Sequence, residues 1–349
     1  MDAVEVDGSY GEGGGQILRT AAAFSVILRR PMKVTKVRAG REVPGLKQQH
    51  ASTMKALAEI FGARVAGAEV GSSEVAFAPG GAVKSSVRVD MKTAASATLL
   101  LQAVVPAVAL SGSGATLELV GGTDVPWSPT FDYLSTVAKA GYAMAGIRFE
   151  AEAPRRGYYP RGGGVVRAAV EASAGVRALD LAGPAGTTRA RVVSRCAGLP
   201  AHVARRQLDA AAARLAGAGV PVESKEAAVG EADSPGSSVL VWSVGEGFAL
   251  GGDCIGERGV RAEDVGARAA DAFCSAARSR AAFDSHLADM VVPLLSLADR
   301  RSTVRVAEVT EHLRTGLHVA SVFTGCESSW EEAGEGWTVS VTPREGHNA

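Results

Sequence analysis

Residues 86–120 read SVRVDMKTAASATLLLQAVVPAVALSGSGATLELV, and their pattern recurs along the chain. Valine alternates with charged or polar residues over 86–90, which predicts a strand. The long apolar run over 93–110 predicts a largely buried helix, and the alternation over 115–120 predicts a second strand. The stretch therefore begins a unit in which strands and helices alternate.

This unit continues past residue 120 and has two further copies. In the second copy a helix follows over 128–140, then strands near 144–150 and 164–171. The first copy has predicted strands at 3–7, 31–37, 64–68 and 73–78, and predicted helices at 13–29 and 45–61. The third has an opening strand at 177–182, helices at 284–298 and 310–323, and strands at 302–308, 325–330 and 336–342. Each copy reads βαβαββ.

About a hundred residues separate the opening strand of the third copy from the rest. They predict a strand at 188–194, a helix at 202–219 that ends at glycine, and strands within 220–227 and 237–244. A further helix is predicted over 263–280. We expect an α+β fold with a large domain of three repeated βαβαββ units (1–182 and 258–349) and a small inserted α/β domain (183–257).

Composition excludes several classes of protein. The 349 residues carry no formal net charge, 46% are hydrophobic and 21% are charged, as in ordinary globular proteins. The four cysteines are far apart and form no CxxC pair, so we expect neither a zinc site nor a disulfide framework. The N-terminus lacks an apolar signal segment, and the window 94–110 is too short and polar to span a membrane. We expect a cytoplasmic protein.

The glycine-rich stretch DGSYGEGGGQILRT (7–20) lies between a predicted strand and helix. Bare backbone N–H groups at a helix start can bind an anion, although glycine runs are more often tight turns. The spacing matches neither the Rossmann fingerprint nor the P-loop. Glu12 could hold a divalent cation such as Mg²⁺ or Mn²⁺, and Arg19 could reach a phosphate.

Basic residues are concentrated between Arg29 and Lys47, where seven lysines and arginines accompany one acid. Arg38 and Arg41 lie three residues apart, between a predicted strand and a helix. Arginine binds phosphate as a bidentate fork, so these two residues with Gln49 form a candidate phosphate-binding corner. A surface ion pair with Glu42 is an equal alternative.

Three more segments carry polar or flat side chains of interest. Gln102 interrupts an apolar helix, where it needs hydrogen-bond partners and could serve a ligand or a loop carbonyl. The stretch GGTDVPWSPTFDYL (121–134) offers aromatic and proline surfaces that could grip a base, although core packing is the commoner use. RRGYYPRGGG (155–164) is a basic, aromatic loop of the kind that can meet a nucleic acid backbone.

His286 lies in FDSHLADMVVPLLSLAD (283–299), where Asp284 or Ser285 can cap an amphipathic helix. In the first turn, the helix dipole would keep the imidazole neutral, and a neutral imidazole can act as a nucleophile. Asp289, three residues on, could orient the ring. A structural role is the alternative. The six histidines show no metal-binding spacing, so a dedicated zinc site is not expected.

Taken in order, these segments resemble the motifs of the RNA 3′-terminal phosphate cyclases over nearly the whole chain. The resemblance implies the three-repeat fold with its inserted domain. It also implies the ATP-dependent conversion of an RNA 3′-phosphate into a 2′,3′-cyclic phosphodiester. In that family a histidine attacks the α-phosphorus of ATP, AMP passes to the RNA 3′-phosphate, and the vicinal 2′-OH then displaces AMP.

The resemblance also implies roles for individual residues. His286 would be the nucleophile, with Glu12 and Arg19 as further catalytic residues and Glu12 as the metal-facing carboxylate. ATP-binding residues would be Gln16, Gln102, Pro129, Arg261 and Asp264. Arg38, Arg41 and Gln49 would bind the RNA phosphate. The chain departs from the usual family pattern at Met290 and Ala95, and Met290 removes a polar contact one turn from His286.

The expected partners are RNA 3′-phosphate ends, with ATP as co-substrate and Mg²⁺ or Mn²⁺. No membrane and no stable protein partner are implied, and a homo-oligomer stays open. One alternative is a non-catalytic, cyclase-like protein of ribosome assembly, which lacks the histidine. Another is an enolpyruvyl transferase, whose domains repeat a similar unit but in longer chains.

Overall fold

The computed structural model describes residues 2–11, 14–81, 83–186 and 189–344, and it contains three copies of one four-stranded unit. The sheets have the orders β1-β2-β4-β3, β5-β6-β8-β7 and β9-β14-β16-β15. In each copy the first two strands pair in parallel, and the second and last pair antiparallel. The predicted α+β class and the three βαβαββ units are confirmed.

The first unit comprises β1 (Val4–Asp7), α1 (Gly15–Ile27), β2 (Met32–Thr35), α2 (Gln48–Phe61), β3 (Arg64–Ala66) and β4 (Val75–Ala78). The second comprises β5 (Ser86–Asp90), α3 (Ala97–Leu110), β6 (Ala115–Gly121), α4 (Phe131–Tyr133), a π-helical turn (Leu134–Ala138), α5 (Lys139–Met144), β7 (Phe149–Arg155) and β8 (Gly164–Val170). The third comprises β9 (Asp180–Leu181), α8 (Ser285–Val291), a 3₁₀ segment (Val292–Leu297), β14 (Ser302–Val306), α9 (Glu311–Thr324), β15 (Glu327–Ala333) and β16 (Gly336–Thr342).

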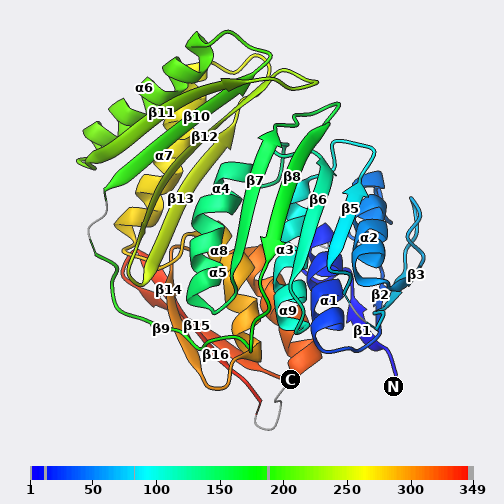
Figure 1. Ribbon diagram of the computed structural model, residues 1–349. Helices are drawn as coiled ribbons and strands as arrows, with labels where there is room; N and C mark the ends of the chain where they lie inside the picture. The colour runs from blue at the N-terminus through cyan, green and yellow to red at the C-terminus, as the bar shows by residue number, and fades with distance from the viewer. Residues whose placement is uncertain (1, 12–13, 82, 187–188, 345–349) are drawn as a thin grey trace.

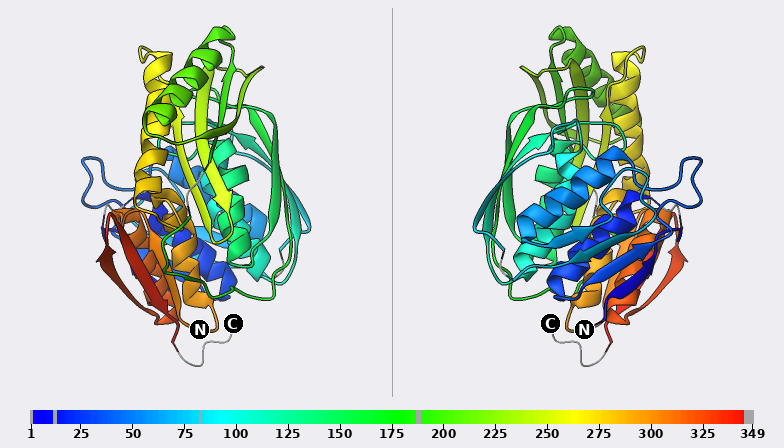
Figure 2. Two further views of the ribbon diagram at one scale, coloured as in Figure 1. Left: turned by 90° about the vertical axis from the view of Figure 1, so that its left-hand side faces the viewer. Right: turned by 90° about the vertical axis from the view of Figure 1, so that its right-hand side faces the viewer.

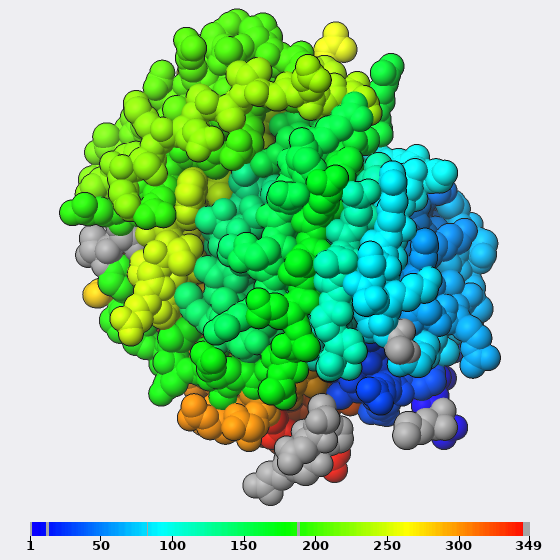
Figure 3. Space-filling model, viewed as in Figure 1, coloured from blue at the N-terminus to red at the C-terminus, as the bar shows by residue number. Residues whose placement is uncertain are grey.

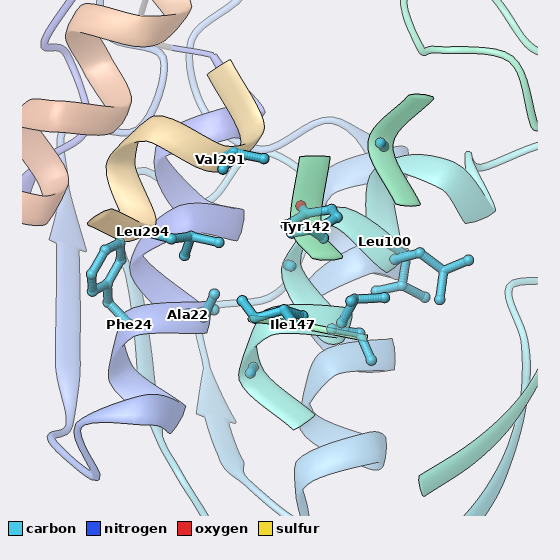
Figure 4. Packing of buried hydrophobic residues seen from close by; sticks show 14 of the residues in the cluster. Ala22, Phe24, Leu100, Tyr142, Ile147, Val291 and Leu294 are labelled. Carbon is cyan, nitrogen blue, oxygen red and sulfur yellow. The ribbon is translucent and has the colours of Figure 1, made fainter. Parts of the chain in front are cut away.

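The sheets of the three units lie on the outside, and their helices pack together at the centre (Figures 1 and 2). Figure 4 shows Ala22 and Phe24 of α1 beside Val291 and Leu294, with Tyr142, Ile147 and Leu100 from the second unit nearby. All seven side chains are buried. Since residues from all three units fill one core, the units stabilise one another.

A separate sheet with the order β11-β10-β12-β13 forms the inserted unit, at the top of Figure 1. Its elements are β10 (Ala190–Ala197), α6 (His202–Gly217), β11 (Val222–Gly230), β12 (Gly236–Gly245), β13 (Phe248–Ile255) and α7 (Ala262–Arg278). Val265, Ala269 and Phe273 of α7 are buried in the second core, together with Leu208 of α6 and Val241 of β12. The predicted boundary at residue 257 would leave α7 in the large domain, so we propose to extend the inserted unit through α7.

Strand β13 was not predicted, because its sequence FALGGDCI carries two glycines that weaken the strand pattern. Close packing explains why glycine stands at both positions. A Cβ at Gly251 would lie 2.7 Å from the Tyr133 ring, and one at Gly252 would lie 2.4 Å from backbone atoms of α7. The bare backbone therefore lets β13 approach a helix on each side.

Two other predicted elements differ in detail. The helix predicted over 284–298 changes at Val292 into a 3₁₀ segment, because Pro293 has no N–H to continue the α-helical hydrogen bonds. The strand predicted near 144–150 begins at Phe149, since α5 runs to Met144 and Gly146 turns the chain at φ 87°. Across the described ranges, no helix combines the length and apolar character needed to cross a membrane.

Candidate active site

Asp284 fixes the start of α8, where His286 lies. Its Oδ1 accepts hydrogen bonds from the Leu287 N–H at 3.0 Å and from the Tyr133 hydroxyl at 2.6 Å. Its Oδ2 accepts one from the Gly251 N–H at 2.8 Å. The sequence predicted this cap, and the structure adds that the cap also joins the second unit and the inserted unit to α8.

The His286 side chain is exposed and meets the buried Tyr133 ring edge-on, with 6.0 Å between the ring centroids. Partial desolvation lowers its pKa. The charges of Asp253, Asp284, Asp289 and Glu308 act in the opposite direction, and the net pKa lies above its ordinary value. The net shift is opposite in direction to the one expected from the helix dipole, because the charges of four surrounding carboxyl groups raise the pKa of the ring.

Two of these carboxyl groups are held by neighbouring backbone or side chains. Asp253 Oδ2 accepts a 2.6 Å hydrogen bond from the Thr130 N–H, and burial raises the pKa of Asp253. Asp289 Oδ1 accepts a 2.5 Å bond from the Thr310 hydroxyl, and burial raises its pKa to about 7. Within the described ranges, Asp289 makes no hydrogen bond to His286, so it does not orient the ring as predicted.

Pro129 and Gln102 lie on neighbouring elements of the second unit. The Pro129 carbonyl accepts a 2.9 Å bond from the Thr98 hydroxyl, and Thr130 next to it caps α4. Gln102 is partly buried and lies four residues beyond Thr98, on the same side of α3. Its backbone carbonyl accepts a bond from the Tyr142 hydroxyl. The two residues predicted to contact the nucleotide, Pro129 and Gln102, therefore lie on neighbouring elements of the second unit. The N–H of Thr130, next to Pro129, connects this region to Asp253.

Gln16 connects the start of α1 to the start of α9. Its amide nitrogen donates to the His312 carbonyl at 2.7 Å, and its Oε1 lies 2.7 Å from His312 Nδ1. Gly316 on the same helix approaches Pro293 so closely that a Cβ there would lie 2.7 Å from the proline ring. These contacts bring the glycine-rich stretch to the third unit, which also carries His286.

Arg19, Arg38 and His50 form a basic corner beside the start of α1. A Cβ on Gly15 would lie 2.6 Å from the His50 ring and 3.2 Å from an Arg19 nitrogen, so only glycine fits there. Burial lowers the pKa of His50 to about 4, and the charges of Arg19, Arg38 and Lys47 add to this effect. The His50 ring is therefore neutral among cations.

Arg38 is 8% exposed, and its Nη2 donates to the Val43 carbonyl at 3.2 Å. Its buried Nε has no hydrogen-bond partner, and burial lowers its pKa. No ion pair between Arg38 and Glu42 occurs in the described part of the chain. A buried guanidinium with an unused donor is suited to an anionic ligand.

The family model whose description is RNA 3′-terminal phosphate cyclase matches residues 10–329. The chain belongs to this family. It is 44% identical over 326 residues to the RNA 3′-terminal phosphate cyclase of Thermococcus kodakarensis, covering 93% of this chain and 94% of that protein. It is 43% identical to the one from Thermococcus gammatolerans, covering 98% of each. The cyclase of Methanopyrus kandleri is 40% identical, with 98% and 99% covered.

In this family member the site residues inferred from the motifs stay predictions, and the structure locates most of them. Arg41 and Gln49 are exposed at the edge of the basic corner, with Gln49 Nε2 3.4 Å from the His50 ring. Glu12 lies outside the described residues. Among the residues that the structure describes, no group of three His, Cys, Asp or Glu side chains could hold a metal ion.

Arg261 and Asp264 are exposed at the start of α7. Glu263 between them accepts two bonds from Arg206 at 2.7 and 2.9 Å. No hydrogen bond or ion pair in the described ranges joins Arg261 or Asp264 to the surroundings of His286. Met290 is half-buried against the main core, and Ala95 is buried. These two departures from the family pattern are therefore packing residues here.

Sequence reasoning missed Asp253, Tyr133, Thr310 and His50 as neighbours of the site. His50 and Tyr133 lie inside segments that the motifs had already indicated. The sequence pattern did not indicate that His50 lies near Arg38 or that Tyr133 lies near His286. Asp253 lies in the strand that was not predicted. Thr310 occupies a helix N-cap, and the residue pattern Thr-x-x-Leu gave no sign of its bond to Asp289.

Proposed function

We propose that this protein is an ATP-dependent RNA 3′-terminal phosphate cyclase that acts through a covalent histidine-AMP on His286. The observation that carries the proposal is an exposed imidazole at the start of α8, within a cluster of carboxyl groups. Contacts through Gln16 and His312 connect this region to the start of α1, which the basic corner adjoins. A nucleophile and an anion-binding corner are what adenylyl transfer to a phosphate requires.

In the first step, a nitrogen of His286 attacks the α-phosphorus of ATP, and the bond to the β,γ-diphosphate breaks, so that pyrophosphate leaves. The attacking ring must be neutral, whereas its carboxylate neighbours favour the protonated form. Because the ring is exposed, its proton can pass to solvent before the attack. The same carboxylates stabilise positive charge on the adenylylated ring and so improve the imidazole as a leaving group.

In the second step, an oxygen of the RNA 3′-phosphate attacks the AMP phosphorus, and the N–P bond to His286 breaks. In the third step, the vicinal 2′-OH attacks the RNA phosphorus, AMP leaves, and the hydroxyl proton passes to solvent. Arg38, Arg41, Gln49 and Arg19 would hold the anionic RNA end. Gln16, Gln102, Pro129, Arg261 and Asp264 would contact ATP. A nucleotide-borne Mg²⁺ or Mn²⁺ needs only one or two carboxylates, and Glu12 is the proposed one.

Adenylylation with α-labelled ATP tests the proposal. Wild-type protein should retain acid-labile label in the presence of Mg²⁺ or Mn²⁺, and His286→Asn should retain none. His202→Asn is the matched control, because His202 is an exposed histidine in the first turn of α6. Label retained by His286→Asn would show that another residue is the nucleophile. An unlabelled wild-type protein would favour the non-catalytic role in ribosome assembly.

A further inference from the structure

Trp127 is the most exposed large hydrophobic residue among those described, with 94% of its surface accessible. Pro126 and Trp127 form a turn in which Trp127 has φ 60°, and Ser128 donates to the Val125 carbonyl at 2.7 Å. Positive φ after proline is the position that a type II turn reserves for glycine or asparagine. Neither burial nor turn preference accounts for an indole here, so its accessible ring needs another explanation.

A second exposed aromatic lies on the adjacent loop. Asp124 pairs with Tyr158 in a parallel bridge, which places residues 124–128 beside the loop between β7 and β8. On that loop Tyr158 is buried, whereas Tyr159 is 68% exposed. Figure 1 shows this loop at the top end of its sheet, next to the inserted unit. In the space-filling view the second unit and the inserted unit meet across the same face (Figure 3).

The surrounding charges include two exposed cations, Arg161 and Lys92. Arg161 is exposed and forms no ion pair with any described residue, while its backbone N–H donates to the Ser234 hydroxyl at 3.1 Å. Lys92 is 83% exposed and lies 4.0 Å from Asp90, at the limit of an ion pair. A Cβ on Gly162 would lie 2.9 Å from residues 93 and 94, so the Lys92 loop adjoins this one. Arg155 and Asp233 pair with each other nearby.

The patch is connected to the proposed active site through the backbone that follows Trp127. Thr130, three residues on, donates its N–H to Asp253, and Asp253 is one of the carboxylates that raise the pKa of His286. Three residues of extended chain span about 10 Å. The Cα atom of Trp127 therefore lies no more than about 10 Å from that of Thr130, whose N–H contacts the Asp253 carboxylate.

We propose that Trp127, Tyr159, Arg161 and Lys92 form a subsite for the single-stranded RNA nucleotides that precede the 3′-phosphate. Bases stack on the two rings, and the two cations contact the backbone phosphates. Stacking platforms flanked by cations are the usual means of binding single strands without reading sequence. This inference rests on the proposed function, since it takes an RNA 3′ end as the substrate.

The test is fluorescence anisotropy with a labelled single-stranded RNA of about eight nucleotides that ends in a 3′-phosphate. Stacking contributes about 1–3 kcal/mol per base, so Trp127→Ala should weaken binding roughly 5- to 150-fold, and Trp127→Phe should restore most of it. Tyr159→Ala should show a smaller loss in the same direction. Val70→Ala, which truncates an exposed side chain between β3 and β4, is the matched control and should bind normally.

Two further measurements separate this subsite from other roles. Arg161→Ala should reduce the slope of log affinity against log salt concentration by about 0.7. The Trp127→Ala loss should disappear when the ligand is a nucleoside 3′-phosphate that has no preceding nucleotides. Binding needs neither ATP nor turnover, so the result does not depend on whether His286 is adenylylated.

Equal affinity of Trp127→Ala and wild type for the RNA would overturn the subsite, even if the protein cyclises RNA normally. An equal loss with the nucleoside 3′-phosphate would overturn it too. A change in sedimentation of Trp127→Ala from an oligomer to a monomer, with unchanged RNA affinity, would identify the patch as a contact between protein chains. If instead the proposed reaction does not occur, His286 should stay unlabelled while RNA binding still depends on Trp127.

Discussion

His286 and His50 both lie within the first turn of a helix, yet their surroundings have opposite charge. Four carboxyl groups raise the pKa of His286. Burial and three cations lower that of His50 to about 4. A helix start alone favours a neutral ring in both places. The difference shows that side chains from other parts of the chain determine the direction in which the pKa of each histidine shifts.

This contrast divides the proposed chemistry between two regions. The carboxylate cluster suits a histidine that gains positive charge when it is adenylylated. The basic corner suits the binding of an anion such as the RNA 3′-phosphate. Substitution of one histidine and one charged residue in each region tests this division.

The largest effect is expected from His286→Asn. Adenylylation should fall by at least about 10³-fold, as is usual when a covalent nucleophile is removed. Cyclisation of an RNA end that already carries the adenylate should persist, because that step needs only anion binding and the 2′-OH. Single-turnover assays with the two substrates measure both rates. Equal loss in both assays would assign His286 a general structural role.

The next effect concerns His50 and stability in acid. Its folded pKa of about 4 is below the unfolded value of about 6.5, so the unfolded chain binds more protons between these values. Stability should therefore fall as pH drops from about 6.5 to 4, by roughly 3 kcal/mol from this residue alone. Urea unfolding of wild type and His50→Gln at pH 7 and pH 4.5 measures it. If His50→Gln loses as much stability between pH 7 and pH 4.5 as the wild type does, the assignment is wrong.

Arg38→Gln should weaken the RNA-dependent steps by about 10- to 150-fold, because hydrogen bonds between charged groups contribute about 1.5–3 kcal/mol. Adenylylation of His286 should change much less, since that step does not use the basic corner for the RNA end. The KM for 3′-phosphorylated RNA and the rate of label incorporation separate the two. An equal effect on both measurements would indicate that Arg38 binds ATP instead.

Asp289→Asn should have the smallest effect on stability, and its sign is opposite to that of His50. The folded pKa of Asp289, about 7, is above its unfolded value near 3.9, so the folded state binds more protons between them. Stability from this group is present below pH 4 and is lost as pH rises toward 7. The shift of about three pH units corresponds to about 4 kcal/mol at pH 8, and the weakened Thr310 hydrogen bond offsets part of it, so removing the carboxylate should raise the free energy of unfolding there by about 1–2 kcal/mol. An unchanged or lower free energy of unfolding at pH 8 would show that other interactions in the folded state stabilise the charged carboxylate.

Much of the fold follows from local patterns in the sequence. Each βαβαββ unit has its own alternating strands and apolar helices, and the quoted stretch at 86–120 matches β5, α3 and β6 within a few residues. The exceptions occur where packing overrides the pattern. Gly251 and Gly252 weaken β13 as a predicted strand, although each glycine lets a helix approach.

The sequence motifs indicated candidate site residues but not the charges around them. The motif around His286 predicted a helix cap at Asp284 or Ser285 and the histidine in the first turn, and the structure has Asp284 as the cap. The protonation state depends on Asp253 from the inserted unit and Glu308 from the third unit, which no local pattern places near α8. In the same way, the spacing of Arg38 and Arg41 indicated an anion-binding corner but gave no sign of the neutral His50 between the cations.

Peptide mapping by mass spectrometry after incubation with ATP tests the central claim most directly. Cleavage after lysine and arginine yields residues 281–300 with His286 and residues 48–55 with His50, so a single digest reports on both histidines. The account predicts one AMP adduct on 281–300 and none on 48–55. An adduct on 48–55, or on neither peptide while the protein still cyclises RNA, would contradict it.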